Sequence, residues 1–144
     1  MPMRLALAGD TMLGRGVAEA LTAVTPSSLV APQLIELTRT AEITVLNLEC
    51  CISERGSPVR LRGKPFFFRA PPQAVELLAH LGVDCVTLAN NHALDFGEAA
   101  LLDTFHQLDS AGIGWVGAGW DLVRGARSGG GGAGRSSAPR IEFV

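Results

Sequence analysis

The sequence is most informative over residues 83–97, Val83-Asp-Cys-Val-Thr-Leu-Ala-Asn-Asn-His-Ala-Leu-Asp-Phe-Gly97. This stretch opens with a short apolar run, residues 83–88, which is rich in β-branched side chains. Such a run is typical of a strand that is covered on both faces in a parallel sheet. The polar block Asn90-Asn91-His92 follows at once. The stretch therefore predicts a buried strand whose carboxyl end carries amide and imidazole groups.

The same pattern of a short apolar run followed by polar or glycine residues occurs at three other places. Amphipathic helical patterns alternate with these runs, and strands that alternate with helices predict βαβ units. We therefore expect an α/β fold with a largely parallel sheet and helices on both faces. The predicted strands are residues 4–8, 43–47, 83–88 and 113–116, each taken as buried, and the predicted helices are residues 16–24, 32–40, 72–81 and 101–108.

Two segments depart from this rhythm. Residues 53–70 contain Gly56, Pro58, Gly63 and Pro65, which predicts an inserted hairpin or loop with a short strand at Phe66–Phe68. Six glycines occur between residues 125 and 138, four of them consecutive. We expect one domain over residues 1–123 and a flexible Gly/Ser/Arg-rich tail over residues 124–144. Residues 140–144 have the pattern of one further strand.

Composition and charge narrow the class of protein. The chain has 144 residues and a formal net charge of −2, which gives no electrostatic reason to expect nucleic-acid binding. No apolar run is long enough for a signal-peptide core or a membrane span, so a soluble, cytoplasmic protein is expected. The three cysteines, Cys50, Cys51 and Cys85, lack the spacing of a metal site or a disulfide framework. The adjacent pair Cys50-Cys51 could coordinate a metal or cross-link, and we predict instead that both are small buried thiols.

Polar side chains gather where the predicted strands end, which is the edge at which open parallel sheets bind ligands. Each of them also has an ordinary structural reading, as a cap, a turn residue or a hydrogen-bonded histidine. Their joint placement favours a functional site. The set comprises Asp10, Asn47, Glu49, Asn90, Asn91 and His92. Carboxylate and amide oxygens with one imidazole suit Mn²⁺, Mg²⁺, Fe or Zn²⁺, and a carboxylate can bridge two such ions.

The segment Gly9–Gly14 superficially matches a phosphate-binding loop. Such a loop needs Lys and then Ser or Thr after its second glycine, to reach the phosphate and magnesium. Arg15 and Gly16 stand there instead, so we exclude that reading.

Five motifs in order make a resemblance specific. They are Gly9-Asp-Thr-Met-Leu-Gly-Arg15, Asn47-Leu-Glu49, Lys64-Pro-Phe-Phe-Phe-Arg-Ala70, Ala89-Asn-Asn-His-Ala-Leu-Asp-Phe-Gly97 and Gly117-Ala-Gly119. Together they resemble the CapA family of capsule-synthesis proteins. That family is tied to poly-γ-glutamate production and is similar in fold to calcineurin-like metallophosphoesterases. The resemblance covers roughly residues 3–122 and implies a metallophosphoesterase-like sandwich.

The resemblance implies a role for each residue of the site. One or two divalent metal ions would be held by Asp10, Asn47, Glu49 and Asn91, with Glu49 in the bridging place. His92 would act as a general acid and Asp95 would orient its ring. Arg15 and Lys64 would bind an anionic small molecule or polymer.

One departure from the family pattern bears on function. Metallophosphoesterase-like sites are usually completed by histidines from the second half of the domain, whereas this chain has only His80, His92 and His106. We therefore expect only the N-terminal half of the fold, as in a truncated or frameshifted product. Three functions remain open: a metal-dependent hydrolase, a non-catalytic binding or assembly component, and an inactive fragment that self-associates through an unpaired sheet edge.

Overall fold

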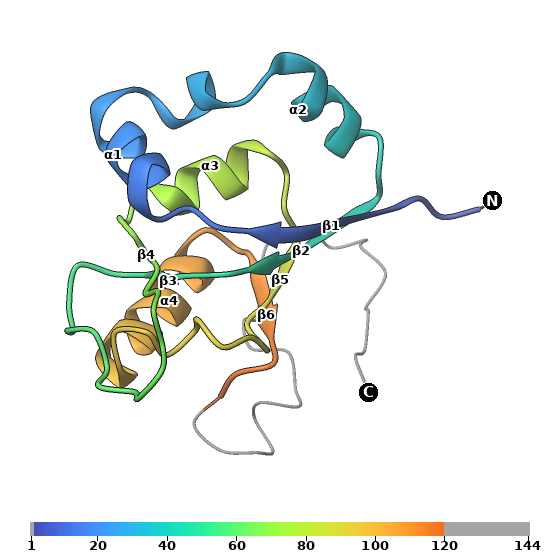
Figure 1. The fold of residues 1–144 in the computed structure, drawn as a ribbon. Coiled ribbons are helices and arrows are strands. Elements are labelled where there is room, and N and C mark those ends of the chain that lie inside the picture. The colour runs from blue at the N-terminus through green and yellow to red at the C-terminus, as the bar shows by residue number, and fades with distance from the viewer. Residues whose placement is uncertain (1, 120–144) are drawn as a thin grey trace.

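A four-stranded parallel sheet forms the centre of the computed structural model, which describes residues 2–119 (Figure 1). Its strand order is β1-β2-β5-β6, and every neighbouring pair is parallel. The strands are β1 (Leu5–Thr11), β2 (Ile43–Leu48), β5 (Cys85–Thr87) and β6 (Gly114–Val116). The predicted α/β class and the four predicted strand positions are therefore confirmed.

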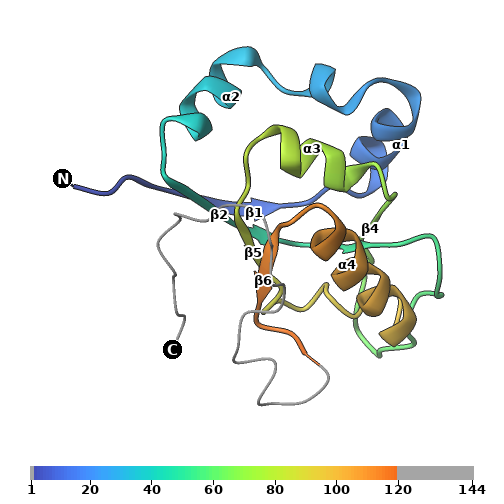
Figure 2. The same ribbon diagram turned by 180° about the vertical axis from the view of Figure 1, so that it is seen from behind.

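Helices flank this sheet (Figures 1 and 2). Leu46, Val86 and Trp115 are in register on one face of the sheet, and they share a core with Leu21 of α1, Leu78 of α3 and Leu108 of α4. These three helices therefore cover the same face, whereas helices were predicted on both. Pro32 begins α2, where its fixed φ suits the first turn. Gly82 and Gly112 follow the ends of α3 and α4 with φ of +70° and +71°, a conformation that favours glycine. The helices are α1 (Arg15–Ala23), α2 (Pro32–Arg39), α3 (Ala74–His80) and α4 (Glu98–Ser110), with a 3-10 turn, η1 (Pro26–Leu29).

The core lies between the sheet and its helices. Leu48 and Val86 of the central strands are fully buried, as are Leu78 of α3 and Leu108 of α4. Among the aromatic side chains, the Phe105 ring of α4 stacks on Trp115 of β6, with the ring centroids 3.9 Å apart. This packing joins α4 to β6. Within residues 2–119, no helix has the length and apolar character needed to cross a membrane.

The prediction of a short strand at Phe66–Phe68 is wrong. The last two residues of the inserted segment instead form β4 (Arg69–Ala70), which pairs in parallel with β3 (Cys51–Ile52), just before the segment. The backbone N–H of Phe68 donates to the carboxylate of Asp95 at 2.6 Å, so it is not used in strand pairing. Phe66 is half exposed, which a covered strand would not allow.

The first strand is also less buried than its apolar sequence predicts. Leu5 is 50% exposed and Leu7 is 75% exposed. Among the described residues, β1 pairs only with β2, so it forms an edge of the sheet. The apolar run therefore predicts the position of β1 correctly, but the prediction that β1 is buried is wrong. The predicted tail at residues 124–144, its boundary at residue 123 and the possible strand at residues 140–144 lie outside the described residues.

Candidate functional site

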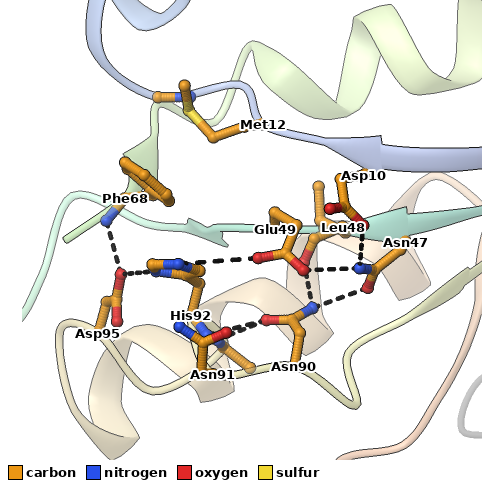
Figure 3. A network of polar contacts seen from close by, with 12 residues as sticks. Asp10, Met12, Asn47, Leu48, Glu49, Phe68, Asn90, Asn91, His92 and Asp95 are labelled. Carbon is orange, nitrogen blue, oxygen red and sulfur yellow. Dashed lines mark hydrogen bonds and ion pairs between the residues drawn. The ribbon is translucent and has the colours of Figure 1, made fainter. Parts of the chain in front are cut away.

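Sheet register brings the predicted site residues to one edge. Asp10 near the end of β1 is in register with Asn47 of β2, and Asn47 is in register with Thr87 of β5. The loops that follow β2 and β5 then carry Glu49 and residues 90–95 to the same edge (Figure 3). Parallel strands end on one side of a sheet, which is why residues 37 to 85 positions apart meet here.

Asn47 lies at the centre of this group. Its side-chain Nδ2 donates to Asp10 Oδ1 at 2.8 Å and to Glu49 Oε1 at 2.6 Å. Its Oδ1 accepts a hydrogen bond from Asn90 Nδ2 at 2.9 Å. The amide is therefore held in one orientation, with its donor side between two carboxylates.

Asn90 organises the loop that carries the histidine. Its Nδ2 also donates to the carbonyl of Leu48 at 2.9 Å, and its Oδ1 accepts from the backbone N–H groups of His92 and Ala93. An Asn side chain that caps the residues two and three positions later is a turn-forming arrangement. From the sequence, Asn90 is a member of the polar set without a role of its own, and the structure gives it this positioning role.

His92 is oriented by three neighbours. Its Nδ1 lies 2.7 Å from Asp95 Oδ2, so the predicted contact between these two residues is present. Its Nε2 faces Glu49 Oε2 at 3.8 Å, and its ring lies against the Phe68 ring with centroids 4.3 Å apart. An ionised carboxylate only accepts hydrogen bonds, so the contact with Asp95 places a proton on Nδ1 and leaves Nε2 turned toward Glu49.

Asp95 is fully buried, and its charge is compensated inside the chain. Lys64 Nζ pairs with Asp95 Oδ1, while His92 and the backbone N–H of Phe68 meet Oδ2. A buried carboxylate is tolerated when it is paired and hydrogen-bonded in this way. Lys64 also donates to the backbone carbonyl of Asn91, so its ammonium holds the loop and Asp95 together.

The remaining predicted residues lie at the rim. Asn91 is exposed, and the described residues offer its side-chain amide no hydrogen-bond partner. Arg15 is the first residue of α1, and its guanidinium lies over the rings of Phe66 and Phe68. The structure thus joins five of the predicted residues through direct contacts: Asp10, Asn47, Glu49, His92 and Asp95. Lys64 lies next to Asp95. Asn91 and Arg15 lie at the rim of the group. Sequence reasoning gave Phe68 no part in the site, since nothing in its apolar side chain signals the use of its backbone N–H.

The chemical character of these groups decides whether a metal ion fits. Over the part of the chain that the structure describes, no three His, Cys, Asp or Glu side chains are arranged as a metal site. Two carboxylates nevertheless converge on one partially positive NH₂ group, that of Asn47, and this electrostatic arrangement also suits a hard cation. The carboxylate oxygens of Asp10 and Glu49 are therefore suitable ligands for a divalent metal. Binding would require the Asn47 NH₂ group to release its hydrogen bonds to both carboxylates.

The cysteines form no part of this edge. Cys50 and Cys51 are buried and all three thiols are free, which confirms the prediction of structural thiols for this pair. Burial raises the pKa of Cys50 to about 12 and those of Cys51 and Cys85 to about 11. Thiols with such pKa values are protonated at neutral pH and are poor nucleophiles or metal ligands.

The fold and this edge together define a class: an α/β chain consistent with part of a metallophosphoesterase-like fold, with acidic and amide side chains and an oriented histidine at its strand ends. The family described as "Bacterial capsule synthesis protein PGA_cap" matches residues 4–128. The chain belongs to this family, which confirms the resemblance drawn from its motifs.

Individual relatives support the same assignment. The chain is 41% identical over 87 residues to the "Probable polyglutamine synthesis accessory protein" of Mycobacterium tuberculosis, in strains CDC 1551 / Oshkosh and ATCC 25618 / H37Rv. That match covers 60% of this chain and 22% of the relative. It is also 33% identical over 85 residues to the uncharacterized protein y4sH of Sinorhizobium fredii, covering 56% of this chain and 18% of that protein. The matched region thus spans about a fifth of the length of these curated relatives.

Proposed function

We propose that this edge is part of a divalent-metal-dependent hydrolase site of the phosphoesterase type, acting in capsule or poly-γ-glutamate synthesis. The observation that carries the proposal is the orientation of His92. Asp95 holds its Nδ1, and its Nε2 faces Glu49 beside Asp10 and Asn47. A histidine in this state, next to a group of acidic side chains, is arranged for proton transfer to a substrate at that edge.

Asp10 and Glu49, together with Asn47 and Asn91, are the residues that would hold the cation, taken as one or two ions of Mn²⁺, Mg²⁺, Fe or Zn²⁺. When bound, such a cation polarises a phosphoryl or acyl oxygen and lowers the pKa of a coordinated water. In this structure the Asn47 NH₂ group holds Asp10 and Glu49 close together, and a cation bound by these two carboxylates would take the place of that NH₂ group.

His92 is the proposed general acid. Its Nε2 would donate a proton to the leaving oxygen of the substrate, and Asp95 would stabilise the imidazolium form through Nδ1. Lys64 keeps Asp95 charge-compensated, so that the carboxylate retains this function in a buried position. The substrate proposed is an anionic small molecule or polymer, because the cationic side chain of Arg15 lies next to the site, whereas the charge of Lys64 is engaged by Asp95.

Hydrolysis of a phosphomonoester and a phosphodiester with added Mn²⁺ tests this proposal. We expect metal-dependent turnover that is lost in Asp10→Ala and reduced by about 10²- to 10⁴-fold in His92→Ala, the usual range for a general acid. His106→Ala and Glu19→Ala, both exposed, are the matched controls and should retain full activity. Equal losses in the control variants would contradict the assignment of His92 and Asp10.

A second candidate is a non-catalytic binding or assembly component of capsule synthesis. One observation favours it: the Asn47 NH₂ group already satisfies both carboxylates from within the chain. The accessory role named for the Mycobacterium tuberculosis relatives points the same way. Folded protein that binds oligo-γ-glutamate but hydrolyses neither ester at any Mn²⁺ concentration would select this candidate.

A further inference from the structure

A cationic and aromatic surface lies beside the site, formed by Arg15, Phe66 and Phe68, and we refer to it as the Arg15 ledge. The guanidinium carbon of Arg15 lies 4.7 Å from the Phe66 ring centroid and 5.0 Å from that of Phe68. The two rings are nearly parallel, at 8° with centroids 6.4 Å apart. Phe68 also contacts the His92 ring at 4.3 Å. The ledge is therefore continuous with the proposed proton donor.

The backbone fixes Arg15 in this place. Arg15 has φ of +52° and is the one non-glycine residue in the described chain with positive φ. A non-glycine residue adopts this conformation rarely, and such residues concentrate at functional sites. The preceding Gly14 packs against the backbone of Arg69, where a Cβ atom would come within 3.1 Å of the Arg69 carbonyl oxygen. The start of α1 is thus seated against the end of the segment that carries both phenylalanines.

The charge of Arg15 has no carboxylate partner among the described residues. Two other cationic side chains differ in this respect, because Arg55 pairs with Asp103 and Lys64 pairs with Asp95. Stacking on aromatic rings covers the flat face of a guanidinium and leaves its N–H groups free in the plane. Those N–H groups form a fork that matches two oxygens of a carboxylate or phosphate.

We propose that Arg15, held over Phe66 and Phe68, binds an oxyanion of the substrate and so directs the substrate toward His92. This inference deepens the proposed function and rests on it for the placement of the substrate. The shared chemistry is a two-oxygen anion, which a carboxylate side group of a glutamate polymer or a phosphate group could supply. Lys64 is excluded from this role because its ammonium is engaged by Asp95 and by the carbonyl of Asn91.

Calorimetric titration of the full chain tests the ledge without catalysis. Oligo-γ-glutamate and inorganic phosphate serve as separate probes, with EDTA present so that no divalent metal contributes. We expect Arg15→Gln to weaken binding of the effective probe by at least about tenfold, as loss of a charge-assisted hydrogen bond implies. Arg15→Lys should restore part of the binding because it keeps the charge without the fork. Phe66→Leu should weaken binding while leaving the charge unchanged.

Arg62→Gln is the matched control, since Arg62 is exposed on the same inserted segment. Full binding by this variant, with loss in Arg15→Gln, supports the ledge. A similar loss in both variants would mean non-specific charge attraction and would overturn it, as would the absence of binding to both probes by the wild-type chain. Circular dichroism checks that each variant is folded. If oligo-γ-glutamate binds and phosphate does not compete, the anion that Arg15 recognises is a carboxylate. If inorganic phosphate binds directly, the anion is a phosphate group.

The two proposals can fail separately. If neither ester is hydrolysed but Arg15-dependent binding is found, the hydrolase proposal falls and the ledge stands as a binding site. If hydrolysis depends on Asp10 and His92 while Arg15→Gln leaves KM and probe affinity unchanged, the ledge falls and the hydrolase proposal stands.

Discussion

Asp95 shows how much one residue can depend on partners distant in sequence. Its carboxylate is fully buried and receives Lys64, His92 and the backbone N–H of Phe68. The His92 contact could be predicted from sequence, because residues three apart in a turn can meet. The Lys64 and Phe68 contacts could not, because they depend on the path of a segment about 30 residues earlier.

Removal of the Lys64 charge should therefore destabilise the fold. We expect Lys64→Met to lower the free energy of unfolding by about 3 kcal/mol, the lower end for a buried charge that loses its partner, since Lys64 keeps slight exposure. Urea unfolding monitored by tryptophan fluorescence measures this change. The exposed control Arg62→Met should shift stability by less than about 0.5 kcal/mol. Addition of Asp95→Asn to Lys64→Met should recover part of the loss, and a strictly additive double variant would contradict the pairing.

Asn47 gives a test of metal binding that does not require activity. Asn47→Asp replaces the NH₂ group that satisfies Asp10 and Glu49 with a third carboxylate. Like charges at this distance repel, so the melting temperature should fall by roughly 5 °C or more without metal. A divalent cation would offset the repulsion, so Mn²⁺ should restore the lost stability in this variant.

The comparison variant is Asn47→Ala, which also removes the donor but adds no charge. Its melting temperature should fall less and should respond less to Mn²⁺ than that of Asn47→Asp. Scanning calorimetry with Mn²⁺ and with EDTA measures both. Equal Mn²⁺ effects on the two variants would show that the cation does not bind among these carboxylates.

At the scale of elements, strands and helices were predictable because each carries its own apolar pattern. The positions of β2, β5 and α4 follow from local apolar periodicity. The inserted segment was not predictable in detail, because it is held by contacts made elsewhere. Its start is tied to α4 by Asp103, which accepts hydrogen bonds from Ser53 and Arg55. The grouping of polar residues at the carboxyl ends of the strands was predictable for a different reason, because the strands of any parallel sheet end on the same side.

The tie between the inserted segment and α4 should depend on pH. Hydrogen bonding from Arg55 lowers the pKa of Asp103 from 3.8 to about 2. A carboxyl with a lowered folded-state pKa contributes stability that is fully present above its unfolded pKa and is lost as the pH falls through the folded value. The stability difference between wild type and Asp103→Asn should therefore be constant above about pH 5 and shrink as the pH falls from about 4 to 2.

Urea unfolding at a series of pH values measures this difference. Glu98→Gln, at the exposed start of α4, is the control and should show no such convergence with wild type. Arg55→Gln should remove the pH dependence that is specific to Asp103, because it removes the first cause of the lowered pKa. A difference that stays constant down to pH 2 would contradict the assigned pKa.

At the scale of the whole molecule, the described residues form a sheet with one well-covered centre and one exposed edge. The central strands β2 and β5 are covered by helices on one face, whereas β1 has a neighbour on one side only and carries two exposed leucines. Burial could not be predicted for β1, because the order of strands in a sheet is a property of the whole fold and not of the run of residues. The same exposure sets the expected behaviour of the chain in solution.

An unpaired strand edge with apolar side chains favours pairing with another chain. Antiparallel pairing of two β1 strands about Leu7 would place Arg4 of one copy opposite Asp10 of the other, which is a favourable match of charge. We therefore expect residues 1–144 to self-associate as concentration rises, measured by sedimentation velocity. Leu7→Lys should shift the distribution toward monomer, because it adds a charge at the exposed strand. Leu37→Lys, at a leucine of α2 that is 65% exposed, is the matched control and should leave association unchanged. A wild-type chain that stays monomeric at high concentration, or an equal effect of both substitutions, would exclude β1 as the association surface.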